Sequence, residues 1–169
     1  MIEKPSQEDY HPFYHTYVSK VPEGDVLDFL NKQSTKFPEL LRAIADKADY
    51  RYGPDKWTLA ELLHHMCDAE RVFSYRAFAI ARGEQAALPG MDQNDYQDNA
   101  HTAGRSFESL VQEFEAIRAA TLALVNALPA EVIDNRGVAS GGEITVRSLI
   151  TIIAGHVAHH QQIIQQRYL

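Results

Sequence analysis

Two of the eight histidines in this chain of 169 residues have the spacing of a shared metal site. His156 and His160 are four residues apart, so on a helix both imidazoles point from the same face and can bind one metal ion. They lie at the centre of an apolar stripe made by Leu149, Ile152, Ile153, Ile163 and Ile164. Imidazoles are costly in an apolar interior without a partner, and a divalent cation satisfies them in their neutral form.

A third histidine is predicted to reach the same interior from another helix. Successive helical residues turn by about 100°, which places His65 at the edge of the apolar stripe of residues 59–80 and its neighbour His64 among polar side chains. We therefore expect His65 to point inward and His64 outward. His65, His156 and His160 would give three protein ligands and an open position, the arrangement of catalytic zinc, which other divalent metals also accept.

The other histidines and the cysteine have plainer interpretations. Surface or arm positions are expected for His11, His15, His64 and His101. His159 is expected to flank the metal ligands, beside them or in a substrate pocket, rather than to be a fourth ligand. Cys67 falls on the other side of its helix from His65 and is interpreted as a small residue without chemistry. Two alternatives stay open: His65 as a hydrogen-bonded core residue, and a bundle whose core histidines hold no metal.

Three charged residues lie close to these apolar stripes. Arg118 falls within the stripe of the third long helix, and Glu70 lies beside the stripe that carries His65. A buried arginine requires a partner, so Glu70 is a candidate for an ion pair. A snorkelling arginine and a substrate-binding role are the alternatives. Asp68 is interpreted as a solvated carboxylate, or one beside the metal ligands, rather than as a catalytic base.

Capping and breaker signals divide the chain into long helices. The predicted helices run from about Asp25 to Asp49, from Thr58 to near Gly83, from Ser106 to Leu128, and from Val146 to the C-terminus. Thr58 and Glu61 have capping-box spacing. Glycine, proline, Asp and Asn predict a long loop over 83–104 and a second loop, able to hold a small hairpin, over 129–145. We predict an all-α four-helix bundle with long connecting loops and a short N-terminal arm.

Length, charge and cysteine content narrow the classes of function. A chain of 169 residues fits a single domain over 1–169. Its formal net charge of −7 argues against binding to nucleic acid or anionic membranes. One cysteine excludes an intramolecular disulfide, and neither a signal peptide nor a membrane-length apolar run is visible. We expect a cytoplasmic protein with no nucleic-acid or membrane partner.

Several segments together resemble the DinB-like (YfiT-like) superfamily. Residues 57–71, WTLAELLHHMCDAER, resemble the family motif of a Trp before a helix carrying His-Leu-x-Asp-x-Glu, with Met66 in place of the usual Leu. Residues 155–163, GHVAHHQQI, resemble its last-helix signature, and residues 81–83, 88–92 and 21–25 also match. The resemblance covers nearly the whole chain. It implies a four-helix bundle, usually a homodimer, with a divalent metal on His65, His156 and His160.

The resemblance implies a metalloenzyme without defining one reaction. Members of the family resemble thiol S-transferases that use bacillithiol or mycothiol, thiol-dependent isomerases, and metal-dependent hydrolases. Our leading hypothesis is one divalent ion and a transferase that joins a low-molecular-weight thiol to a small-molecule electrophile. The alternatives are a hydrolase of an amide or ester and a non-catalytic, metal-binding stress-response bundle. Three imidazoles do not distinguish Zn, Ni, Fe and Mn, and the sequence assigns no catalytic residue.

Overall fold

Each long helix begins at a side-chain cap, in a computed structural model that describes residues 1–102 and 104–169. The Thr58 hydroxyl accepts a hydrogen bond from the Glu61 N–H, and the Glu61 carboxylate accepts one from the Thr58 N–H, which is the predicted capping box. This box starts α3 (Leu59–Ala81). The other long helices are α2 (Val26–Ala43), α5 (Phe107–Asn126) and α6 (Val146–Arg167), capped by Asp25, Ser106 and Thr145.

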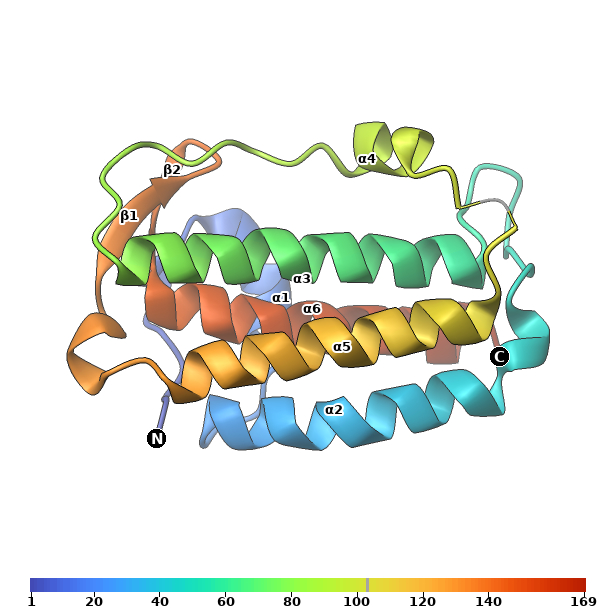
Figure 1. Ribbon diagram of the computed structural model, residues 1–169, viewed down its shortest axis with the longest axis horizontal. Helices are drawn as coiled ribbons and strands as arrows, with labels where there is room; N and C mark the ends of the chain where they lie inside the picture. The colour runs from blue at the N-terminus through green and yellow to red at the C-terminus, as the bar shows by residue number, and fades with distance from the viewer. Residues whose placement is uncertain (103) are drawn as a thin grey trace.

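These helices form the predicted four-helix bundle. α3 packs against α5 and α6, and α2 packs against the same two helices. α3 and α5 run in the same direction, whereas α2 and α6 run in the opposite one (Figure 1). Because α3 ends far from where α5 begins, residues 82–106 must return along the length of the bundle. This return segment was predicted as a loop; it also contains α4 (Gln93–Asn99), which begins where Asp92 accepts two backbone N–H bonds.

The connection between α5 and α6 contains the small hairpin that the sequence allowed. After a 3₁₀ turn, η4 (Ala130–Val132), β1 (Arg136–Ala139) pairs antiparallel with β2 (Gly142–Thr145). Ser140 and Gly141 both have positive φ, at 53° and 79°, as a two-residue hairpin turn of the I′ type requires. Leu88 of the return segment exchanges backbone hydrogen bonds with Val138 and Ser140, so the hairpin anchors one end of that segment.

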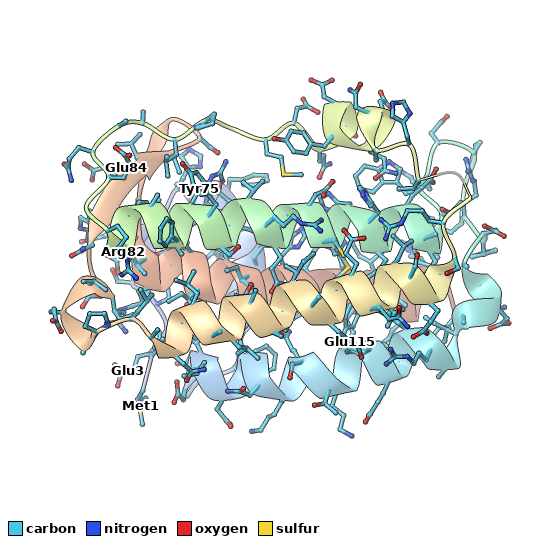
Figure 2. All side chains as sticks on the ribbon, viewed as in Figure 1. Met1, Glu3, Tyr75, Arg82, Glu84 and Glu115 are labelled. Carbon is cyan, nitrogen blue, oxygen red and sulfur yellow. The ribbon has the colours of Figure 1, made fainter. Side chains whose placement is uncertain are left out.

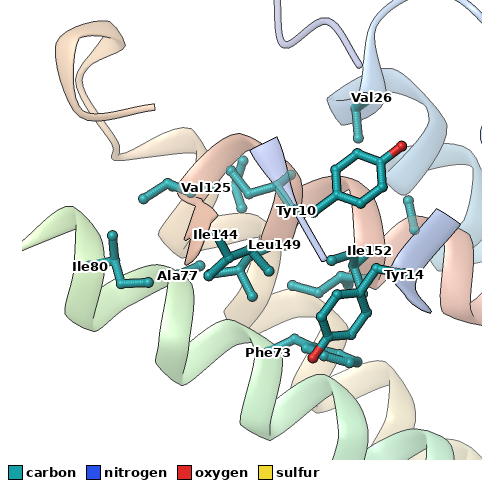
Figure 3. Packing of buried hydrophobic residues seen from close by; sticks show 14 of the residues in the cluster. Tyr10, Tyr14, Val26, Phe73, Ala77, Ile80, Val125, Ile144, Leu149 and Ile152 are labelled. Atoms are coloured by element: carbon teal, nitrogen blue, oxygen red, sulfur yellow. The ribbon is translucent and has the colours of Figure 1, made fainter. Parts of the chain in front are cut away.

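The N-terminal arm is part of the core. It consists of η1 (Gln7–Asp9), η2 (Pro12–Tyr14) and α1 (His15–Val18), and α1 packs against α6. Tyr10 and Tyr14 are buried in the same cluster as Val26 and Phe73 (Figure 3). Gly155 permits this contact, because a Cβ atom built there would lie 2.2 Å from the Tyr17 carbonyl oxygen. The arm therefore reaches α6 one residue before His156.

The first long helix is shorter than predicted. It ends at Ala43 rather than near Asp49, and the 3₁₀ turn η3 (Ala45–Lys47) follows it. Backbone bonds from the Leu59 N–H to the Tyr50 carbonyl and from the Ala60 N–H to the Ala48 carbonyl then join this segment to the start of α3. The chain leaves the helix early because it must fold back against α3.

A buried polar network joins all four long helices. Arg118 of α5 donates to both carboxylate oxygens of Glu70 of α3, at 2.8 Å each. It also donates to the side-chain oxygen of Gln33 of α2, which in turn donates to the Ala154 carbonyl of α6. Arg118 is 0% exposed and Glu70 is 2% exposed. The predicted ion pair is confirmed, and it fixes α6 two residues before His156.

The outer faces carry exposed ion pairs. Arg42 of α2 contacts Glu108 and Glu115 of α5, and Glu115 lies on the side of α5 that faces α2 (Figure 2). Across residues 1–102 and 104–169, the helices are too short or too polar for any of them to cross a lipid bilayer.

Candidate metal centre

The three predicted ligands converge at one point in the bundle. His65 comes from α3, and His156 and His160 come from successive turns of α6. The Nε2 atom of His156 lies 3.2 Å from that of His65 and 3.1 Å from that of His160. All three side chains are buried, with exposed fractions of 4–8%. The interior face chosen by helical periodicity is therefore the one on which these histidines meet.

The spacing of these nitrogens fits a shared metal ion. A histidine nitrogen lies about 2.0–2.1 Å from a bound zinc ion, so two such nitrogens on one tetrahedral ion are about 3.4 Å apart. The observed separations of 3.1 and 3.2 Å are close to this value. The residues form a group of three side chains that could hold a metal ion, with donor atoms within 4.8 Å of one another.

The surroundings keep these imidazoles neutral, which is the form that binds a metal. Burial, together with the nearby His64, lowers the pKa of His65 to about 4. Burial also lowers the pKa of His156 and His160 well below the ordinary value, and the neighbouring imidazoles add to this effect. At neutral pH the three side chains therefore present lone pairs rather than charges.

Aromatic rings hold the histidines in place. The Trp57 ring lies 5.0 Å from that of His65, and the rings of Tyr17 and Phe73 lie 5.2 and 6.0 Å from that of His156. Trp57 is itself fixed from the end of the chain that follows α6, because the Tyr168 hydroxyl donates to its carbonyl oxygen at 2.7 Å. The N-terminal arm, α3 and α6 thus each contribute a ring or a histidine to the site.

A cavity of about 260 Å³ opens beside the histidines. His65 and His156 form part of its wall, and the remainder comes from the arm, from α3, from the hairpin and from Met91 and Gln93 of the return segment. Arg76 of α3, 3% exposed, also lines it. Sequence reasoning missed Arg76 and Tyr17. A signal for Arg76 was present, because a residue eleven positions after His65 lies on nearly the same helical face.

The prediction that His64 faces solvent is wrong. His64 is 8% exposed, and its Nδ1 lies 3.5 Å from a carboxylate oxygen of Asp68. α3 packs against α5 as well as α6, so its buried surface extends beyond the apolar stripe. Within the described part of the chain, His64 is not grouped with the three converging histidines. The structure therefore separates the two adjacent histidines as predicted, although both are buried.

The remaining candidate residues lie around the centre. His159 is partly exposed, flanks the ligands, and packs its ring 5.0 Å from that of His160 and 5.4 Å from that of Tyr17. Asp68 contacts His64 and Arg71 on the outer side of α3. Cys67 is buried in the apolar cluster that contains residues of α5, and burial raises the pKa of its thiol.

Glu70 and Arg118 bind each other, as described above. The Arg118 guanidinium is fully buried between Glu70 and Gln33. It therefore links α5 to α3 and α2. It is Arg76, not Arg118, that lines the cavity beside the histidines.

The fold and the site define a class of helical bundles with an inward-facing histidine cluster. The chain belongs to the DinB superfamily, whose family profile matches residues 30–164. The resemblance inferred from the sequence motifs is therefore confirmed.

Two individual proteins illustrate the likeness. A protein of Oceanobacillus iheyensis, named "putative metal-dependent hydrolase", is 26% identical over 162 residues, which cover 94% of this chain and 84% of that protein. YfiT from Bacillus subtilis, described as a probable metal-dependent hydrolase with an unusual four-helix bundle topology, has a similar structure. The match has a TM-score of 0.68 and 13% sequence identity, and it covers 96% of this chain and 92% of YfiT. This likeness confirms the fold.

Proposed function

We propose that the protein is a divalent-metal-dependent enzyme that joins a low-molecular-weight thiol to an electrophilic small molecule. His65, His156 and His160 hold the metal. The observation that carries the proposal is the convergence of three buried, neutral imidazole nitrogens beside a cavity with aromatic walls. Ligands of this kind suit a catalytic ion, because three protein ligands leave a position for a substrate.

The chain's residues prepare the site for a nucleophile. A bound divalent ion supplies Lewis acidity, which lowers the pKa of a thiol or of water. The rings of Tyr17 and Phe73 cover His156 and exclude water from one side of the cluster. Electrostatic attraction is stronger where water is excluded, so an anionic nucleophile is held more firmly there. The apolar wall also offers a surface for the carbon skeleton of an electrophile.

A second candidate is hydrolysis of an ester or amide. The Oceanobacillus relative and YfiT both carry descriptions as metal-dependent hydrolases, which supports this reaction for a related chain. The same three histidines serve both reactions, which differ in whether a thiol or water attacks.

The first experiment measures metal content. Protein purified without chelators is expected to carry about one divalent ion per chain, and His65→Ala, His156→Ala and His160→Ala are each expected to lose it. His64→Ala and His159→Ala are matched controls, because each removes a histidine adjacent to a ligand. Absence of metal from the wild type, even after reloading, would contradict the proposal.

The second experiment separates the two reactions. Metal-loaded protein is assayed with a panel of small thiols and an electrophile, and in parallel with ester and amide substrates. Thiol conjugation above the rate of the His156→Ala variant supports the transferase. Cleavage of esters or amides with only background conjugation identifies the hydrolase, and no turnover in either panel contradicts an enzymatic role.

A further inference from the structure

Arg76 differs from the other deeply buried arginine of the bundle. Arg118 is bound by both oxygens of Glu70, whereas the contacts that the structure gives Arg76 are to neutral groups. Its Nη2 donates to the Pro89 carbonyl oxygen at 2.6 Å, and its guanidinium carbon lies 5.7 Å from the centre of the Phe73 ring. Within residues 1–102 and 104–169, the ion pairs at 4.0 Å or less leave Arg76 without a carboxylate.

A buried guanidinium in this position would be stabilised by a bound anion. Arg76 is 3% exposed, and a buried charge is costly unless it is paired and hydrogen-bonded. Arginine presents five N–H donors in a planar fork, and a carboxylate can accept two of them in parallel. The bond to Pro89 occupies only part of that fork, and the side chain lines the same cavity as His65 and His156.

We propose that Arg76 binds a carboxylate group of the substrate in the cavity beside the histidines. This deepens the proposed function, on which it rests, by naming the substrate class: a small organic acid whose carboxylate meets Arg76 while another part of the molecule reaches His65 and His156. The volume of about 260 Å³ limits its size.

The position of Arg76 also fixes the orientation of such a molecule. Arg76 and His65 lie on nearly the same face of α3, three turns apart. The aromatic ring of Phe73 lies between them in the sequence and contacts both Arg76 and His156. An acid with an apolar middle would therefore place its charge at one end of the cavity and its reacting group at the other.

Calorimetric binding tests the proposal with two pairs of probes. Benzoate is compared with benzyl alcohol, and mercaptoacetate with 2-mercaptoethanol, so each pair differs mainly in the carboxylate. We expect the acid of at least one pair to bind tenfold or more tightly than its neutral partner, as a charge-assisted pair implies. A preference confined to mercaptoacetate assigns the carboxylate to the thiol, and one for benzoate assigns it to the other substrate.

Variants assign this preference to Arg76. Arg76→Met is expected to abolish it while leaving the neutral probes unchanged, and Arg76→Lys to weaken it because the fork is lost. Arg71→Met, on the same helix but half-exposed and paired with Glu113, is the matched control and is expected to keep it. If Arg76→Met does not fold, as judged by circular dichroism, the wild-type probe pairs and Arg76→Lys decide.

The benzoate pair is also measured on metal-stripped protein. Arg76 is expected to give the same preference there, so a protein without a functional metal still tests this inference, and a preference that needs the metal contradicts it. Equal binding of acid and neutral probes by the wild type, or an unchanged preference in Arg76→Met or Arg76→Lys, would overturn the proposal.

Discussion

Removing one partner of the buried Arg118–Glu70 pair should destabilise the bundle strongly. Arg118→Met leaves the Glu70 carboxylate, 2% exposed, without the donors that now lie 2.8 Å from both of its oxygens. Breaking a buried pair in this way typically costs about 3–5 kcal/mol. A domain has about 5–15 kcal/mol of net stability, so the loss is a large fraction of the total. Glu70→Leu should cost a similar amount, because it leaves Arg118 charged and fully buried.

The double variant distinguishes a charge effect from a packing effect. Arg118→Met with Glu70→Leu removes both charges, and replacing a whole buried pair by apolar residues is often neutral or stabilising. Gln33 then loses the Arg118 donor, which costs about 1 kcal/mol. We therefore expect the double variant to lie within about 2 kcal/mol of the wild type, far from the sum of the single losses.

Urea unfolding followed by far-ultraviolet circular dichroism measures these differences. Arg42→Met serves as the control, because it removes an arginine that also binds carboxylates, but in solvent, where ion pairs contribute little. Single variants that lose less than about 1 kcal/mol would refute the reasoning. So would a double variant whose loss equals the sum of the two, since the pair would then not act as a unit.

Three further predictions concern packing, protonation and metal binding. Gly155→Ala should destabilise the protein by about 1–3 kcal/mol in urea unfolding, because its Cβ would lie 2.2 Å from the Tyr17 carbonyl oxygen, although alanine is the better helix former. Gly137→Ala should cost less, because its Cβ would lie 2.6 Å from a side-chain atom of Ile80 rather than from backbone, and the reverse order would contradict this interpretation. Burial raises the pKa of Tyr168 to about 12, so the absorbance titration of the wild type minus that of Tyr168→Phe should show a phenol ionising near pH 12 rather than near 10. Since the folded pKa is the higher one, the corresponding stabilisation is present below about pH 10 and is lost as the pH rises through 12. Chelation of a metal bound between α3 and α6 should lower the thermal unfolding midpoint, and an unchanged midpoint in protein shown to have lost its metal would argue against a ligand set that spans these helices.

The long helices could be predicted because their signals are local. The Thr58–Glu61 capping box fixes where α3 begins, and the apolar period then determines that His65 points toward α6. The same period brings His156 and His160 together from one helix. For these three histidines, the helical turn of about 100° per residue is enough to predict which side chains point toward one another.

The features that sequence reasoning missed depend on packing between distant segments. His64 is buried although it lies outside the apolar stripe, because α3 packs against α4 and α5 as well as α6, and no local pattern in α3 reveals this. α4 is the exception, because its signal is local: Asp92 caps a helix in a segment rich in Asp and Asn, which have weak helix propensity. Tyr17 reaches His156 only because Gly155 lets the arm approach α6. This last contact joins residues more than a hundred positions apart, and neither partner alone indicates it.

The ribosome synthesises Tyr17 long before Gly155. At about 5–20 residues per second, the delay between the two residues is on the order of ten seconds. Throughout that interval the nascent chain has no α6, so Tyr10 and Tyr14 lack the part of their packing that α6 supplies in the finished protein. The wall that the arm gives to the cavity can close only after the last helix has been synthesised. A newly made chain therefore acquires the complete site only after α6 has been synthesised, since His156 and His160 also lie on that helix.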